Sequence, residues 1–501
     1  MRRATTSSLL ALALAGSGCS PHKVTHAPAP PVQLPAAFAA AGASAEAAPD
    51  RWWTVFADPQ LDALVGRALT DNFQLHAAWA RVAQAQAGAR QLGHTLPELT
   101  ATASAGRQKS RFVLPDPIGE VSVSSNSFAL QAAAAYEVDV WKRLGSQQAG
   151  IGLDAAALRD DVDAIAVSLA GEITEAWLDL RAARARIALL EQQLATNQAS
   201  LEVLESRFRA GLLPSILDVY QQRSLVAQVR GQIVGARAGL DATLARVAGL
   251  VGSTPGQLGG LADGATATLP AVPVLPAAGV PADLLERRPD VRAARRRVEA
   301  ADHRVAAAVA DRLPALRLQG SLSLSSSTLA DLIATPLWSL LGAITAPLFD
   351  NGRRAAAVDQ QHAVVSERLA GYGQAMLTAM TEVEAALAQE QHQLALVVEL
   401  TAQRELAAAT LREARDRYRE GQIDYLPVLS ALQAEQRVEL AALDAARQHL
   451  SLRVRLYRAL GGTWTRTLAA PALARPRAST SSPNSPPRQP APGRTTPTRT
   501  P

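Results

Sequence analysis

The sequence contains the same pattern twice. Residues 136–143 read Tyr-Glu-Val-Asp-Val-Trp-Lys-Arg and are matched 210 positions later by residues 346–353, Ala-Pro-Leu-Phe-Asp-Asn-Gly-Arg. The same offset places 207–211 over 417–421, and upstream the offset becomes 216 or 217. A match that survives small insertions is typical of a duplicated structural unit. We therefore expect one elongated body built from two repeats, residues 51–250 and 285–464, joined by a Gly-, Pro- and Ala-rich connector at 251–284.

The N-terminus predicts export and a lipid anchor. Two arginines precede a short apolar run over 9–15, which is typical of a signal peptide, here residues 1–18, and is too short to span a membrane. Cys19 is the sole cysteine, so no intramolecular disulfide is possible. Its place directly after Gly-Ser-Gly resembles a bacterial lipobox, and Ser20 after it implies sorting to the outer membrane. The alternative is an ordinary secretory signal with an incidental cysteine. Residues 19–50 are then a lipidated linker.

The basic character of the chain lies in its two ends. The sequence pI is about 9.7, but five arginines at 471–501, within the tail 465–501, and two in the leader account for the positive charge. The remaining chain has a formal net charge of −2. No basic face for nucleic-acid binding is therefore expected. The tail is dense in Pro, Ser, Thr and Arg, which predicts disorder.

A ladder of apolar residues predicts a helix too long for a globular domain. Between 161 and 208 apolar or small side chains recur every three or four positions, and Asn197 takes the one polar position. This is the spacing of coiled-coil packing with a local change of supercoil. Gly171 is the one glycine and no proline occurs between 153 and 210, so the helix would be on the order of 90 Å long. The second repeat has the same plan over 354–420.

Each long helix is expected to end at a turn and to be followed by a returning helix. The turns begin with Gly211 and Gly421, and the second helices run to about residues 250 and 460. Pro214 suits a helix start because its φ is already helical. Pro427 lies deeper and is tolerated only within a first turn.

Strand patterns precede each long helix. Apolar and polar residues alternate through the strand pairs expected at 98–141 and 315–350. Apolar-out and polar-in alternation is typical of a transmembrane barrel strand, whereas a sandwich strand would leave the long helices with nothing to pack on. Because four strands cannot close a barrel and an open edge is not tolerated in lipid, the chain must oligomerise. Three copies would supply twelve strands.

These motifs together resemble the TolC-like outer-membrane efflux proteins, in particular the lipoprotein branch that serves RND-type pumps. The resemblance covers about residues 50–464. The residues that carry it are Trp53, Phe56, Asp58-Pro59, Leu61, Asn72, Ala80-Arg81-Val82, Tyr136 to Trp141, Arg287 to Val291, Pro347 to Asp350, Arg417-Tyr418, Gly421 and Leu460-Gly461-Gly462.

The resemblance implies a fold and a function. The fold is mainly α with a transmembrane β-barrel: a trimeric, twelve-stranded outer-membrane barrel continued by a coiled-coil α-helical tunnel through the periplasm. The protein would be a passive duct that exports small molecules as the outer-membrane channel of a tripartite pump. Its partners would be two further copies of itself, outer-membrane lipid, a periplasmic membrane-fusion adaptor and an inner-membrane RND-type transporter.

The resemblance also implies a periplasmic gate at the tip turns. Tyr418 matches a family tyrosine that hydrogen-bonds to a neighbouring helix, Asp218 matches its acidic partner, and Leu426 matches a hydrophobic constriction. Simple packing is the alternative for Tyr418. Family members often carry an acidic residue at the position of Pro427, and Asp424 is a candidate to supply that charge here. An acidic, cation-binding entrance is therefore one of the alternatives.

Two other classes of protein compete with this interpretation. A coiled-coil outer-membrane lipoprotein without a pore would not need polar-in strands, and a type I secretion duct is disfavoured by the lipobox. An enzyme is not expected, since no acids, bases or nucleophiles cluster in the sequence. The eight histidines are scattered, with His94 and His303 standing alone, and no cofactor or metal is expected.

Overall fold

The structure is a computed structural model that describes residues 21–26, 28–39, 49–92, 97–115, 119–212, 215–258 and 267–470. The signal peptide, Cys19, His94, Pro214 and residues 471–501 lie outside this part of the chain. The elements appear twice in the same order, a helix, two strands, a long helix and a returning helix. The first set is α3 (Phe73–Leu92), β1 (Glu98–Leu114), β2 (Gly119–Val138), α4 (Arg143–Arg209) and α5 (Leu217–Leu250); the second is α8 (Pro289–Ala310), β3 (Ala315–Ser326), β4 (Pro336–Thr345), α9 (Arg353–Arg419) and α10 (Tyr425–Leu460).

Shorter elements lie at the middle of the body. They are the 3-10 helices η2 (Trp52–Phe56), η3 (Pro255–Gln257), η4 (Pro281–Asp283) and η5 (Trp464–Thr467), with the helices α2 (Pro59–Asp71) and α7 (Leu284–Arg287). Asp58 caps α2 by accepting hydrogen bonds from the backbone N–H groups of Gln60 and Leu61, ahead of Pro59 at the first helical position.

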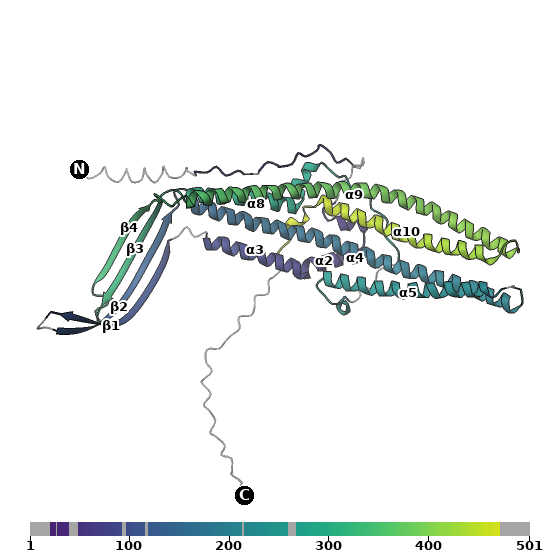
Figure 1. Ribbon diagram of the computed structural model, residues 1–501, viewed down its shortest axis with the longest axis horizontal. Coiled ribbons are helices and arrows are strands. Elements are labelled where there is room, and N and C mark those ends of the chain that lie inside the picture. The colour runs from purple at the N-terminus through teal and green to yellow at the C-terminus, as the bar shows by residue number, and fades with distance from the viewer. Residues whose placement is uncertain are drawn as a thin grey trace, which may run out of the picture.

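The molecule is elongated, with the sheet at one end and the tips of two helical hairpins at the other (Figure 1). α4 and α9 each hold 67 residues, which corresponds to about 100 Å. α4 begins at Arg143, ten residues before the start expected from the proline- and glycine-poor run. The expected length is therefore an underestimate, because Gly145, Gly150 and Gly152 are accommodated inside the helix.

The four strands form one antiparallel sheet in the order β1-β2-β3-β4. The central pairing of β2 with β3 joins the two repeats, with Leu130 opposite Leu324 and Tyr136 opposite Leu318. β1 and β4 are the edges of this sheet in the single chain. β4 exposes all of its large apolar side chains, namely Leu337, Trp338, Leu340, Leu341 and Ile344.

The helical core has three parts. One surrounds Trp52 and Trp177 at the middle of the body, a second surrounds Tyr372 and Met376 on α9, and the third lies among α4, α5, α9 and α10 toward the tip. The expected tail boundary at 465 is wrong. Thr465 is fully buried, and Arg159 on α4 donates hydrogen bonds to backbone oxygens of 465 and 468, so residues 465–470 belong to the body.

A buried ion-pair network joins the two repeats through α4 and α8. The guanidinium of Arg292 on α8 lies 3.2 Å from a carboxylate oxygen of Asp160 and 3.2 Å from one of Asp163, both on α4. All three side chains are at most 5 % exposed. Burial raises the pKa of Asp163 in spite of Arg159 and Arg292 beside it. Burying these charges therefore costs desolvation free energy, and removing one partner would cost more, because a buried charge would lose its partner.

Replacing Arg292 with leucine should destabilise the folded body, because Asp160 and Asp163 then keep only the less buried Arg296 and Arg159 as cationic partners. We expect a loss of roughly 3 kcal/mol, the lower end of the range for a broken buried ion pair. Arg186→Leu, which breaks the exposed pair with Asp444, is the matched control and should cost less than about 1 kcal/mol. Denaturant unfolding followed by circular dichroism measures both. Equal losses would mean that the buried network does not hold the repeats together.

Candidate functional site

Two regions of the elongated body connect its parts and are candidates for function. The first, which we call the junction, is where the strands pass into the long helices, at residues 137–143 and 345–354 (Figure 1). The second, which we call the tip, comprises the last turns of α4 and α9 and the first turns of α5 and α10. The repeated sequence segments fall at these two places.

The junction turns the chain from strand to helix in the same way twice. The carboxylate of Asp139 accepts hydrogen bonds from the N–H groups of Leu144 at 3.0 Å and Gly145 at 2.7 Å, in the first turn of α4. Asp350 accepts one from the N–H of Arg354 at 3.3 Å in α9. These carboxylates satisfy free N–H groups at the positive end of each helix.

The turn also requires left-handed backbone. Lys142 has φ 60° directly before α4, and Asn351 and Gly352 have φ 53° and 79° directly before α9. Asn and Gly are the residues that adopt this conformation at the lowest cost, whereas Lys142 is strained. The junction geometry is therefore maintained against a local penalty.

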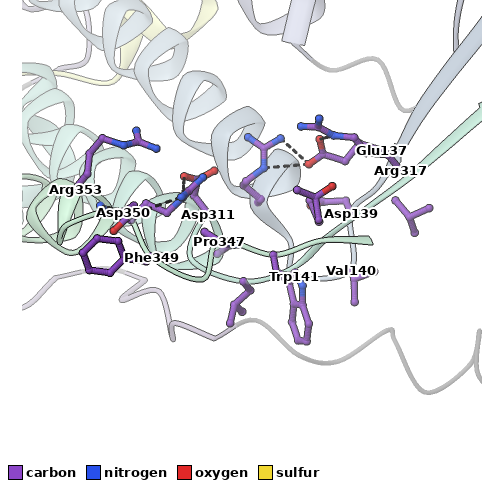
Figure 2. A pocket seen from close by; sticks show the side chains of 18 residues that line it. Glu137, Asp139, Val140, Trp141, Asp311, Arg317, Pro347, Phe349, Asp350 and Arg353 are labelled. Atoms are coloured by element: carbon purple, nitrogen blue, oxygen red, sulfur yellow. Dashed lines mark hydrogen bonds and ion pairs between the residues drawn. The ribbon is translucent and has the colours of Figure 1, made fainter. Parts of the chain in front are cut away.

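A pocket of about 450 Å³ lies at the junction and is lined by charged side chains from both repeats (Figure 2). Glu137 pairs with Arg143 at 2.6 Å and with Arg317 at 3.5 Å. Arg354 pairs with Asp311 at 3.1 Å and Asp350 at 3.2 Å. These charges neutralise one another across strand and helix, so the pocket has the chemistry of a structural joint between sheet and helices.

The tip brings the predicted gate residues into one region. Asp218 lies in the first turn of α5, and Asp424 is the residue before α10. The pKa of Asp218 is raised, chiefly by burial and then by the negative charge of Asp424. Leu426, in the first turn of α10, is 55 % exposed in the single chain. The two hairpins therefore place two carboxylates near each other beside an exposed leucine.

Tyr418 does not make its expected hydrogen bond in the single chain. Its hydroxyl is buried and has no hydrogen-bond partner, so the bond to Asp218 is not formed. The ring instead packs edge-on against Tyr425, with centroids 5.5 Å apart, and the Arg207 guanidinium lies 5.4 Å from its centroid. The alternative reading of Tyr418 as a packing residue describes these contacts.

A buried chain of hydrogen bonds near the tip was not anticipated as a site. Tyr425 Oη donates to Gln222 Oε1 at 2.8 Å, and Gln222 Nε2 donates to the backbone oxygen of Asn197 at 2.8 Å. Gln436 Nε2 then donates to Asn197 Oδ1 at 2.9 Å. All four side chains are buried, and they come from α4, α5 and α10. We call this set the polar ladder.

The polar ladder joins the two hairpins. Asn197 was visible in the sequence as the polar position of the heptad pattern, but its partners lie 25 and 239 residues away. A buried polar side chain in a helical interface selects one register, because any other register leaves it unsatisfied. The ladder therefore sets how one hairpin lies along the other.

No group of three or more His, Cys, Asp or Glu side chains in the described part of the chain is arranged to hold a metal ion. Within the same residues, no helix combines the length and the apolar character needed to cross a membrane.

Comparison with known proteins places the chain in a family. A model of the family described as outer membrane efflux protein matches residues 64–253 and 280–462, one segment in each repeat. The pyoverdine export outer membrane protein OpmQ of Pseudomonas putida is 34% identical over 474 residues, covering 91% of this chain and 97% of its own. The outer membrane protein OprJ of Pseudomonas aeruginosa is 31% identical over 475 residues, covering 91% and 95%.

Solved structures agree with the sequence comparison. The outer-membrane channel OprN superposes with a TM-score of 0.79 at 28% identity, covering 89% of this chain and all of its own. The fold also matches the open state of the MtrE outer membrane channel of Neisseria gonorrhoeae, with a TM-score of 0.77. With duplicated helical hairpins, a four-stranded sheet and these matches over both repeats, the chain belongs to the outer membrane efflux protein family and is an efflux channel protein of the outer membrane.

Proposed function

We propose that this protein works as a homotrimeric, passive duct. The observation that carries the proposal is the open sheet, whose edge strands β1 and β4 are each paired on one side only within the described residues. Three sheets joined β4 to β1 would pair every edge and close a twelve-stranded barrel, which lipid requires. The exposed apolar side chains of β4 would then face lipid or a neighbouring chain. A lipoprotein spacer without a pore has no use for such a sheet.

The proposed duct belongs to a three-part pump. We assign its partners as a periplasmic membrane-fusion adaptor and an inner-membrane RND-type transporter, supported by its relatives, which include a pyoverdine export protein and the toluene efflux pump protein TtgF. The cargo is then a small molecule, and the energy comes from the inner-membrane partner. The duct itself performs no catalysis, so the junction and tip serve shape and gating.

The oligomeric state is the first test. In mild detergent the purified chain should have the mass of three copies by light scattering, because only closure of the sheet satisfies its edge strands. Far-UV circular dichroism of the same sample reports whether helices and strands are intact. A monomer with intact secondary structure would overturn the proposal.

We place the gate at the tip, with Asp218, Tyr418, Asp424 and Leu426 as its residues. In a trimer the two carboxylates of each chain would surround the entrance, and Leu426 would narrow it. Among the described residues the hydroxyl of Tyr418 is buried without a hydrogen-bond partner, so its bond to Asp218 would form only when the ring reorients as the trimer closes. A hydrogen bond to a charged group contributes roughly 1.5–3 kcal/mol, and three such bonds suffice to keep open ducts rare.

The double variant Asp218→Ala with Tyr418→Phe should raise single-channel conductance in planar bilayers and sensitise cells to large antibiotics such as vancomycin, because it removes these bonds. Tyr220→Phe is the control, since that ring lies near the tip and is 56 % exposed. Tyr425→Phe tests the polar ladder and should also raise conductance. If the double variant conducts like wild type, the gate lies elsewhere, at Leu426 or Asp424.

We further propose that Cys19 carries a lipid that anchors the chain in the outer membrane. Cys19 itself lies outside the described residues, and the support is the lipobox-like sequence with Ser20 after it. Palmitate labelling should mark the wild type and not Cys19→Ala. The unlipidated variant should still form trimers, since closure of the sheet does not depend on the lipid. Equal labelling of both proteins would refute lipidation at this residue.

A further inference from the structure

The segment that follows the proposed lipid site lies against the helical body. Residues 21–26 and 28–39 run beside α8 and α9, where Phe38 is 4 % exposed within the core around Tyr372 (Figure 1). The N–H of Ala39 donates to Glu384 Oε1 at 2.6 Å. Pro31 lies so close to Gly373 that a Cβ there would approach Pro31 Cγ to 3.1 Å. The end of the segment nearest Phe38 is held by apolar contacts and one carboxylate.

The other end of the segment is held by a single buried carboxylate. Asp302 on α8 is 8 % exposed, and its Oδ1 lies 2.7 Å from His22 Nε2. Its Oδ2 accepts a hydrogen bond from the N–H of Thr25 at 2.6 Å. Both carboxylate oxygens of Asp302 thus bind residues of the segment 21–26.

Four histidines gather at the same place. The rings of His22 and His362 on α9 are 6.3 Å apart between centroids, and those of His26 and His303 on α8 are 6.0 Å apart. The sequence predicts that His303 stands alone, and this prediction is wrong. Half of the eight histidines of the chain lie in this one cluster, contributed by three separate segments.

The charged groups of the cluster do not balance once the histidines are protonated. Glu299 and Asp302 on α8 both act on His303, and so do the imidazoles of His26 and His22. From α4, the residue packed on His303 is Gly150, which has no charge, while Arg304 and Asp154 pair with each other. Around His303, two carboxylates thus act together with two further imidazoles.

We propose that this cluster is an acid-sensitive latch that fastens residues 21–26 to α8 and α9 at neutral pH and releases them as the pH falls toward about 5. The imidazoles pack in two pairs, and Asp302 holds the segment through His22 and Thr25. Protonation of one histidine is matched by Asp302. Further protons place like charges about 6 Å apart in a partly buried site, where they repel.

The environment of His303 supports this direction. Its pKa is lowered, first by burial and then by His26, against opposite contributions from Asp302 and Glu299. Its Nδ1 is buried without a hydrogen-bond partner. The docked segment therefore favours the neutral ring. A histidine with a lowered pKa stabilises the docked state fully above its ordinary pKa of about 6.5, and that contribution decreases below this value and is lost as the pH falls through the lowered pKa.

Hydrogen exchange measured by mass spectrometry on the full-length protein in detergent tests the latch. Labelling times at pH 7.5, 6.5 and 5.0 are adjusted to compensate for the change of the intrinsic amide exchange rate with pH. The readout is the deuterium uptake of the peptide that contains the Thr25 amide. Wild type should lose about tenfold or more of its protection between pH 7.5 and 5.0. The segment next to Phe38 should keep its protection, because apolar contacts hold it.

Variants separate the latch from a general effect of acid. His26→Gln with His303→Gln should keep at pH 5.0 nearly the protection that it has at pH 7.5. His392→Gln, an exposed histidine of α9 outside the cluster, should behave like wild type. Asp302→Asn should weaken protection at every pH. Circular dichroism at pH 7.5 reports whether each variant folds. Equal protection of wild type at both pH values, or an unchanged pH response of the double variant, would overturn the proposal.

Discussion

The buried contact of Arg292 with Asp160 and Asp163 is the interaction on which the arrangement of this chain depends. It lies between α4 and α8, which belong to different repeats and have no short covalent connection. Two apolar helix faces could slide along each other with little change in buried area, whereas a buried guanidinium with two carboxylates has one satisfied position. This contact sets the second repeat against the first, and the β2–β3 pairing continues the same alignment into the sheet.

The arrangement of the junction and of the tip depends on that alignment. At the junction, capping by Asp139 and Asp350 starts α4 and α9 where the strands end, and the paired charges around Glu137 and Arg354 keep sheet and helices in a fixed relation. At the tip, the polar ladder sets the register of the hairpins over the last part of their length. A long duct needs both the junction contacts and the polar ladder, because small angular errors at one end of a helix of about 100 Å become large displacements at the other.

The N-terminal segment adds an element outside the duplication. Its end at Phe38 is held by apolar contacts and by Glu384, whereas its other end is held by Asp302 within a cluster of histidines. With the proposed latch, attachment of the segment has a permanent part at Phe38 and a conditional part that depends on pH. Since the conditional part is nearest to Cys19, release would change the length of free chain between the body and a lipid on that cysteine.

The sequence by itself determined the duplication, the long helices, the four strands and the family, because heptad spacing, strand alternation and glycine turns are local patterns repeated in each half. It also marked Asn197 as a polar position in an apolar ladder. Only the tertiary structure decided what Asn197, His303 and Tyr418 contact. Gln436 lies 239 residues from Asn197, and His26 lies in a segment that carries no heptad pattern. Residues 465–470 likewise look like tail, but Arg159 binds them to the body. Local periodicity shows which face of a helix is buried, whereas the partner on the other side of that interface depends on how distant elements pack.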